Sequence, residues 1–296
     1  MRLKVATAKW PVGQPRDFSD FAERIRTQVM RAADSGAQLA VLPEYLSLEL
    51  AATFDDTTSG DLHASLSAIQ RYRDDWLALF ATLARDSGMN LIAGTFLLDI
   101  GSRCYRNRAD LFTASGGHHW QDKLQLTGFE KRTGLIEPGD ALKVFDLDGV
   151  RVGIVICYDS EFPLPVRAQC EAGARVLIVP SCTDTEAGAS RVRVGCLARA
   201  LENRCFVVQS VTAGDAAWSP ALDTNTGEAA IYAPMDVGLP ADGIVTQSRG
   251  EAIWTFAELD LGALEASRAQ AQVSVDRDWP GQLRPAIMRA YVDQPT

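Results

Sequence analysis

Cys157 is the residue of this sequence best placed to act as a nucleophile. It directly follows the apolar run Val152–Ile156, and Pro163, a few residues later, can open a helix. A cysteine at such a strand-to-helix turn exposes its sulfur, and the N-terminus of the helix favours the thiolate. Because free cysteines are more often buried packing residues, a catalytic role for Cys157 requires a base and a positive charge nearby.

Glu44 is the candidate base. It ends the apolar run Leu39–Leu42, directly after Pro43, which cannot extend a strand ladder. Polar residues beyond the carboxyl ends of strands in α/β sheets are good functional candidates, so we expect Glu44 at the same rim as Cys157. The alternative roles of Glu44 are a solvated loop carboxylate and a helix cap.

Lys123 is the candidate cation, although the local pattern around it says little. It lies in the amphipathic stretch 118–126, and it is followed by Glu130 and by the turn Glu137-Pro138-Gly139. A lone lysine is usually a surface charge. Near Cys157, however, an ammonium group would favour the thiolate and stabilise the oxyanion that forms when sulfur attacks a carbonyl group.

Together these segments resemble the nitrilase, or carbon–nitrogen hydrolase, superfamily. The matching segments, in chain order, are Leu42-Pro43-Glu44, Lys123, Glu130 with Glu137-Pro138-Gly139, Gly153 to Asp159, Val179-Pro180-Ser181 and Ala198 to Asn203. The resemblance extends from about residue 4 to about residue 260, and its strength lies in the combination because each fragment alone is weak. It implies an α/β fold, the four-layer αββα sandwich of the nitrilase type. It also implies a homodimer or larger homo-oligomer, with contacts near Pro163–Gly173 and Gly195–Asn203.

The resemblance further implies a catalytic triad of Glu44, Lys123 and Cys157. Glu44 would accept the thiol proton, protonate the leaving ammonia or amine, and activate the water that hydrolyses a Cys157 acyl-enzyme. A second glutamate would hold Lys123; Glu130 is the candidate and Glu137 the alternative. The scheme needs no metal and no organic cofactor, and the sequence has neither a Cys/His zinc spacing nor a Gly-rich phosphate loop.

The expected substrate is a small-molecule amide. Tyr158-Asp159 follows the nucleophile as in amidase-like branches of the family, whereas nitrilases proper tend to carry Trp-Glu. Hydrolysis of N-carbamoyl compounds or of nitriles is the alternative. Tyr158 and Glu161 are the candidate substrate-binding residues. Many amidase-like relatives carry Arg in place of Glu161, so an acid there would repel substrate carboxylates, unless it only caps the next helix or pairs with an arginine.

Two alternative hypotheses compete with this interpretation, a different type of hydrolase and a protein without catalytic activity. A papain-like hydrolase would use a histidine base, for which the sequence offers His63, His118 and His119. The pair His118-His119 lies in a predicted turn, where a solvated loop is the ordinary role. A binding protein with the same fold and no catalysis is the second competitor, because a fold alone does not guarantee activity.

The elements that must position these residues are predicted by hydrophobic patterning. Short runs rich in Val, Ile and Leu predict buried strands at 5–8, 39–42, 91–96, 152–156, 176–179 and 206–208. Helical spacing relates Ile69, Tyr72, Trp76, Phe80 and Leu83. The segments Gly36–Glu44 and Gly173–Ser181 share a Gly-Ala turn, a strand and a proline, which predicts two related units and two sheets packed face to face.

Composition limits the partners and the location. The chain has 296 residues, and we expect one domain over 1–270 and a C-terminal tail, 271–296, that can pack on a partner subunit. A formal net charge of −9 argues against nucleic acid or anionic lipid as a main partner. Neither a signal-peptide pattern nor a run of ~20 apolar residues is present, so we expect no membrane partner and a cytoplasmic location. The cysteines lack paired spacing, which predicts free thiols.

Overall fold

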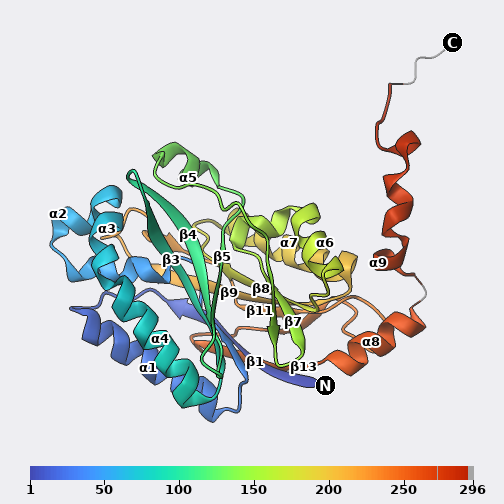
Figure 1. The fold of residues 1–296 in the computed structure, drawn as a ribbon, viewed down its shortest axis with the longest axis horizontal. Coiled ribbons are helices and arrows are strands. Elements are labelled where there is room, and N and C mark those ends of the chain that lie inside the picture. The colour runs from blue at the N-terminus through green and yellow to red at the C-terminus, as the bar shows by residue number, and fades with distance from the viewer. Residues whose placement is uncertain (272, 293–296) are drawn as a thin grey trace.

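Every apolar run singled out in the sequence contributes a strand to the computed structural model, which describes residues 1–271 and 273–292. The strands form two sheets that pack face to face, with helices on both outer faces (Figure 1). The predicted four-layer αββα sandwich is therefore confirmed.

The first sheet has the strand order β5-β4-β3-β2-β1-β13. The strand β1 pairs in parallel with β2, and β2 pairs in parallel with β3, whereas β4, β5 and β13 join antiparallel. The strands are β1 (Arg2–Pro11), β2 (Leu39–Val41), β3 (Asn90–Gly101), β4 (Cys104–Phe112), β5 (His118–Asp122) and β13 (Trp254–Asp260).

The second sheet has a parallel centre, β7-β8-β9, to which β6, β11 and β12 add antiparallel. Its strands are β6 (Val144–Leu147), β7 (Val150–Ile154), β8 (Val176–Ser181), β9 (Phe206–Asp215), β11 (Ala230–Tyr232) and β12 (Ile244–Gln247), and the short β10 (Thr224–Asn225) pairs with the end of β9. The two sheets are connected through β1, because its last residues, Lys9 to Pro11, pair with β9.

Two apolar clusters hold the layers together. One lies between the first sheet and the helices α1 (Phe18–Asp34) and α4 (Arg73–Ser87), and it includes Phe21, Trp76 and Phe80. The other fills the space between the sheets and continues under α6 (Pro163–Glu171) and α7 (Glu186–Asn203). Burial of these continuous apolar faces is the main favourable term for such a stack of layers.

The predicted amphipathic helix is divided in the structure. Residues before Arg73 form α3 (Leu62–Ile69) and the 3-10 turn η2 (Gln70–Tyr72), and α4 then carries Trp76, Phe80 and Leu83 on its buried face. The Gln70 amide donates to the carbonyl oxygens of Leu66 and Leu97, which fixes the turn against β3. Between β2 and α3 lie the 3-10 helix η1 (Leu46–Thr53) and α2 (Asp56–Ser59).

The pattern of a Gly-Ala turn, a strand and a proline, which occurs in both halves of the sequence, corresponds to similar backbone geometry. Gly36 and Gly173 both have positive φ after a helix, at +80° and +100°. In the first half, Ala37 N donates to Ala32 O, and the next residue bonds to β1. In the second half, Ala174 N donates to Gln169 O, and the next residue bonds to β7. The equivalent strands, β2 and β8, lie in different sheets, which supports the interpretation of two related units.

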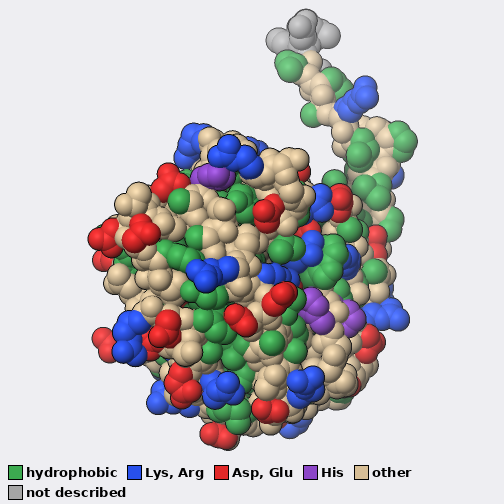
Figure 2. Space-filling model, turned by 60° about the vertical axis from the view of Figure 1, so that its left-hand side comes forward, with side chains coloured by type: hydrophobic (Ala, Val, Ile, Leu, Met, Phe, Trp, Pro, Cys, Tyr) green, Lys and Arg blue, Asp and Glu red, His purple; other side chains and the backbone are tan. Residues whose placement is uncertain are grey.

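The C-terminal segment leaves the body of the protein after α8 (Leu261–Gln270). It continues as α9 (Val275–Asp278), η4 (Trp279–Leu283) and η5 (Pro285–Ile287) and projects outward, with hydrophobic side chains exposed (Figure 2). Arg268 pairs with Asp276 at 2.5 Å and holds α9 to the body. The predicted tail, 271–296, includes residues 272 and 293–296, which lie outside the described residues.

Two further features concern thiols and membranes. The six cysteines are unpaired, as predicted. Within the described ranges, no helix combines the length and the apolar character needed to cross a bilayer.

Candidate active site

Cys157 lies at the junction between β7 and the helices that follow it. The 3-10 helix η3 (Cys157–Glu161) comes between β7 and α6, so the predicted strand-to-helix turn is present with one extra helical turn. Cys157 has a φ of +48°, a left-handed conformation that is unusual for a residue with a side chain. Its sulfur lies 3.6 Å from the Cys182 carbonyl oxygen at the end of β8, and the residue lines a cavity of about 440 Å³.

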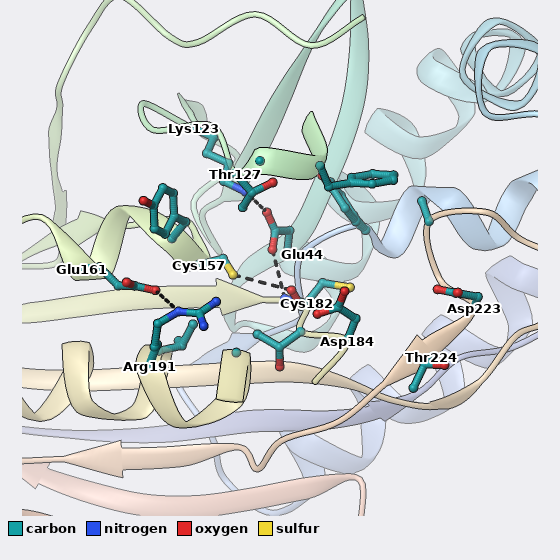
Figure 3. Close-up of a pocket in the computed structure, with 18 of the residues that line it drawn as sticks. Glu44, Lys123, Thr127, Cys157, Glu161, Cys182, Asp184, Arg191, Asp223 and Thr224 are labelled. Atoms are coloured by element: carbon teal, nitrogen blue, oxygen red, sulfur yellow. Dashed lines mark hydrogen bonds and ion pairs between the residues drawn. The ribbon is translucent and has the colours of Figure 1, made fainter. Parts of the chain in front are cut away.

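Glu44 is placed by the end of β2 and is only 1% exposed. Its Oε1 atom accepts hydrogen bonds from Lys123 Nζ and Asn107 Nδ2, both at 2.8 Å. Its Oε2 atom accepts from the Cys182 backbone N–H at 3.0 Å. The carboxylate therefore connects the first sheet to the second beside Cys157, as Figure 3 shows.

Lys123 follows β5 directly and is 2% exposed. Its ammonium group donates to Glu44 at 2.8 Å and to Glu130 at 2.9 Å. The backbone is held as well, because Lys123 N donates to Asn107 O and Gly139 N donates to Lys123 O. The Glu-Pro-Gly turn thus contributes through its main chain to the position of the lysine.

Of the two glutamates left open by the sequence, Glu130 contacts Lys123. It lies in α5 (Gly128–Thr133), is fully buried, and forms a capping box with Thr127. The Tyr45 hydroxyl donates to Glu130 Oε1 at 2.8 Å. Glu137, in contrast, is an exposed residue whose backbone N–H donates to Tyr105 O.

The pKa values of these groups are shifted by burial and by their mutual charges. Burial raises the pKa of Glu44 although Lys123 opposes the shift. Burial would lower the pKa of Lys123, but the two carboxylates more than offset this and hold it well above its usual value. Burial and then the Glu44 charge raise the pKa of Cys157 well above that of a free thiol. At neutral pH the site therefore holds a charged lysine beside a protonated thiol.

The cavity has charged side chains on both sides of these residues. The Glu161 carboxylate lies 3.3 Å from Arg191 Nε on α7, so the pairing with an arginine considered from the sequence is present, and Glu161 also lines the cavity. Figure 3 shows Asp184 and Asp223 on the opposite side from this pair. Tyr158 lines the cavity too, and its ring meets Phe162 edge-on at 5.0 Å between centroids.

Four residues that contact the site were not predicted from the sequence. Asn107 and Tyr45 bind the carboxylates of Glu44 and Glu130, and Asp159 binds the backbone around Lys123. Cys182 comes after β8 as Cys157 comes after β7, so its position beyond the carboxyl end of a strand could have identified it from the sequence. Asn107 gave no such signal, because it lies within an ordinary antiparallel strand.

The histidines lie away from this cavity. His118 Nε2 is 3.0 Å from Asp110, His63 is near Arg103, and His119 packs against Phe145. Over the part of the chain that the structure describes, no histidine lines the cavity. In the same residues, no group of three or more His, Cys, Asp or Glu side chains is arranged to hold a metal ion. The arrangement gives no support to a Cys/His hydrolase.

Comparison with known proteins identifies relatives with this fold. A probable hydrolase of Bacillus subtilis is 29% identical over 277 residues, which cover 93% of this chain and 53% of the relative, so the chain spans about half of that protein. An omega-amidase of Xenopus laevis is 24% identical over 270 residues, covering 88% of this chain and 90% of the relative. The crystal structure of Saccharomyces cerevisiae Nit3, a member of the nitrilase superfamily, superposes with a TM-score of 0.73 at 22% identity, over 93% of this chain and 96% of that one.

The family model for carbon–nitrogen hydrolases matches residues 4–244. This range contains Glu44, Lys123, Glu130 and Cys157, together with both sheets up to the start of β12. The chain therefore belongs to the carbon–nitrogen hydrolase family.

Proposed function

We propose that this protein hydrolyses the amide bond of a small molecule to an acid and ammonia through an acyl-enzyme on Cys157. The observation that carries the proposal is the buried Lys123 ammonium group, 2.8 Å from Glu44 and 2.9 Å from Glu130, at the cavity that Cys157 lines. A cation held in this way is a preorganised charge for an oxyanion.

In the first step, Glu44 accepts the Cys157 proton as the sulfur attacks the carbonyl carbon. The thiol is protonated at rest, because burial and the Glu44 charge raise its pKa. The raised pKa of Glu44 makes this carboxylate a better proton acceptor than an exposed glutamate. Lys123 stabilises the negative charge that develops on the carbonyl oxygen.

The second step breaks the carbon–nitrogen bond. Glu44 returns the proton to the leaving nitrogen, and a thioester remains on Cys157. Glu44 then takes a proton from water, which attacks the thioester, and the acid leaves as the thiol re-forms. Glu130 keeps Lys123 in place through both steps. The scheme draws on no metal and no organic cofactor.

Several observations support an amide as the substrate. The similarity to an omega-amidase and the Tyr158-Asp159 pair after the nucleophile favour amides over nitriles. The cavity, of about 440 Å³, fits a small molecule. Tyr158 and Glu161 are the proposed substrate-binding residues because both line this cavity.

A panel of small amides, N-carbamoyl compounds and nitriles, assayed for ammonia release, tests the proposal. We expect turnover of amides, a transient mass increase on Cys157 equal to the acyl group, and loss of both in Cys157→Ala. Cys196→Ala, which removes a buried thiol outside the cavity, is the matched control and should keep most of the activity. Exclusive turnover of nitriles or carbamoyl compounds would reassign the substrate class. No turnover of any compound by a protein whose Cys157 is intact would favour the inactive binding protein.

We also propose that the protein is a cytoplasmic homodimer. Leu164 on α6 and Val194 on α7 are 68% and 59% exposed, which leaves apolar surface on the face where the family resemblance places the contact. Acidic and basic side chains are interspersed over the face shown in Figure 2, and this mixture supports the expectation that nucleic acid is not a partner.

A further inference from the structure

Asp159 is a buried carboxylate beside the catalytic residues and outside the proposed mechanism. It is 5% exposed and lies in η3, two residues after Cys157. It does not line the catalytic cavity. Its side chain instead accepts backbone hydrogen bonds from Leu124 at 3.2 Å, Gln125 at 2.6 Å and Ile156 at 3.3 Å.

These donors belong to the two segments that carry the cation and the nucleophile. Leu124 and Gln125 directly follow Lys123, and Ile156 directly precedes Cys157. The carboxylate of Asp159 thus bonds to the neighbours of both catalytic residues. Gln125 and Leu124 are 34 and 35 residues away from Asp159 in the chain.

The connection matters because the two segments are otherwise fixed to different sheets. Lys123 N donates to Asn107 O on β4, in the first sheet. Val155 N, just before the nucleophile, donates to Ile178 O on β8, in the second sheet. A small shift of one sheet against the other would change the distance between the Lys123 ammonium group and the Cys157 sulfur, unless a contact such as that of Asp159 holds the two segments together.

The turn that contains Cys157 also needs support. Its φ of +48° is a strained conformation for a residue with a side chain, and such conformations persist where surrounding contacts fix them. Asp159 closes this turn twice, since its backbone N–H donates to Ile156 O at 3.0 Å and its carboxylate accepts from Ile156 N.

The chemistry of the carboxylate argues for a positional role. Burial raises its pKa to about 7, although Lys123 and the three backbone donors favour the charged form. Lys123 is the charged group that faces it. Asp159 also lines a small second cavity, and the other residues that line it, from the Leu124–Gln125 segment, Leu142, Ile154–Val155 and α6, are uncharged. Burying this charge works against folding, so its benefit must lie elsewhere.

We infer that Asp159 is a positioning residue for the proposed hydrolysis, holding the Lys123 segment and the Cys157 turn at the separation that attack requires. The inference rests on the proposed function for its role in turnover. The geometry that it explains also governs how fast the Cys157 sulfur reacts with any electrophile, and that rate can be measured without an amide substrate.

The test compares Asp159→Asn with Asp110→Asn as the matched control. Asparagine preserves the size of Asp159 but turns an N–H₂ group toward backbone N–H donors. Asp110 is also a buried carboxylate, bound to Arg73 and His118 away from the cavity. We expect Asp159→Asn to lower kcat and the rate of Cys157 alkylation by iodoacetamide by about 10- to 100-fold, the size of effect that misplacement by about 1 Å produces. KM should stay within about threefold, since Asp159 does not line the cavity, and Asp110→Asn should leave both rates near the wild-type values.

Three outcomes would overturn the inference. They are unchanged kcat and alkylation rates in folded Asp159→Asn, an equal loss in Asp110→Asn, and a raised KM with unchanged kcat. Absence of turnover in the wild type would instead refute the proposed function and leave the alkylation comparison valid.

Wild-type protein provides a second measurement if Asp159→Asn does not fold. Protonation of Asp159 removes an acceptor for the backbone donors. Amide hydrogen exchange of the peptide 123–127, corrected for the intrinsic effect of pH, should therefore become faster as the pH falls from 8 to 6, while β8 serves as the internal reference. A peptide whose corrected exchange does not change with pH would contradict the inference.

Discussion

Lys123 is 2% exposed and places a positive charge at this site. Two carboxylates offset that charge and make its burial possible. Lys123 is bonded to Glu44 and Glu130 at 2.8 and 2.9 Å, so its charge is offset from two sides. Removing one partner from such a buried network leaves an uncompensated charge. At the scale of single residues, substitutions therefore affect stability and catalysis together, and both must be measured.

Lys123→Ala should lower kcat by about 100- to 1,000-fold, because it removes the charge that stabilises the oxyanion. It should also reduce the free energy of unfolding by about 3 to 5 kcal/mol, since Glu44 and Glu130 lose their common partner. Lys123→Arg should not restore activity, because the planar guanidinium group is larger than the ammonium group. Denaturant unfolding shows whether each variant is folded under assay conditions. Full activity of Lys123→Arg would mean that any nearby positive charge is sufficient.

The pH dependence of kcat/KM should follow the protonation of Glu44. The mechanism needs its carboxylate form, so activity should fall as the pH decreases through the pKa of Glu44. Because burial raises that pKa above the ordinary value of 4.5, the acid limb should lie above pH 4.5. The pKa of Lys123 is held well above its ordinary value of 10.5, so no loss from its deprotonation should occur between pH 8 and 10. An acid limb at or below pH 4.5 in a pH–rate profile would exclude Glu44 as the base described here.

Glu161→Gln should shift selectivity toward substrates that carry a carboxylate. The substitution releases Arg191 from its ion pair at the cavity wall. For a pair that is partly exposed, the expected change is about two- to fivefold in the ratio of kcat/KM for a carboxylate-bearing amide and a matched amino-amide. Glu171→Gln is the control, because Glu171 pairs with Arg167 outside the cavity. An unchanged ratio would leave Glu161 with a structural role only.

At the scale of elements, close contact between β3 and the end of β2 places Glu44. Gly94 in β3 has a φ of +71°, and a Cβ atom there would collide with the carbonyl oxygen of Pro43, directly before Glu44. The Tyr45 backbone N–H donates to Thr95 Oγ1 at 2.8 Å on the other side of Glu44. The strand pair thus holds the residues on both sides of Glu44.

Gly94→Ala should therefore reduce both stability and kcat, whereas Gly88→Ala should affect stability alone. Gly88, which ends α4, also has a positive φ, +64°, but a Cβ atom there would meet no atom within 4 Å apart from those of its chain neighbours and its own helix backbone. We expect Gly88→Ala to cost about 1 to 2 kcal/mol of unfolding free energy from the left-handed backbone. Gly94→Ala should cost more than this and lower kcat by displacing Glu44. Thermal unfolding and steady-state kinetics test both, and normal kcat in Gly94→Ala would show that the Glu44 loop tolerates the shift.

At the scale of the whole molecule, the two sheets divide the proposed catalytic residues between them. Glu44 and Lys123 follow strands of the first sheet, and Cys157 follows a strand of the second. The site exists because the sheets pack face to face, connected by β1 and by the bond from Cys182 N to Glu44. Contacts that fix one sheet against the other therefore fix the distances between the groups of the proposed reaction.

Val194→Asp should weaken the proposed dimer, because it places a charge on the exposed apolar face of α7. Light scattering should find a dimer for the wild type at micromolar concentration and a monomer for the variant. Ile100→Asp is the control and should remain dimeric, because Ile100 is an exposed apolar residue on β3, outside the segments proposed for the contact. A monomeric wild-type protein would contradict the proposal.

The sequence by itself determined the residue types of the site and the elements that carry them. Apolar runs in front of Glu44 and Cys157 predicted the strands, because buried strands are continuous in Val, Ile and Leu, and Pro163 predicted the start of α6. These signals are local, and each can be read from a few neighbouring residues.

Only the tertiary structure decided which distant groups meet. The sequence offered Glu130 as the partner of Lys123 but kept Glu137 open as the alternative, and it did not select Asn107 or Asp159 as ligands of the site. The Asn107 and Asp159 contacts join segments 63 and 34 residues apart in the chain, whereas Lys123 and Glu130 are 7 residues apart but lie in different elements. Their geometry depends on how strands, helices and the two sheets are arranged in space, and side-chain patterning within one segment records which face is buried but not what it will touch.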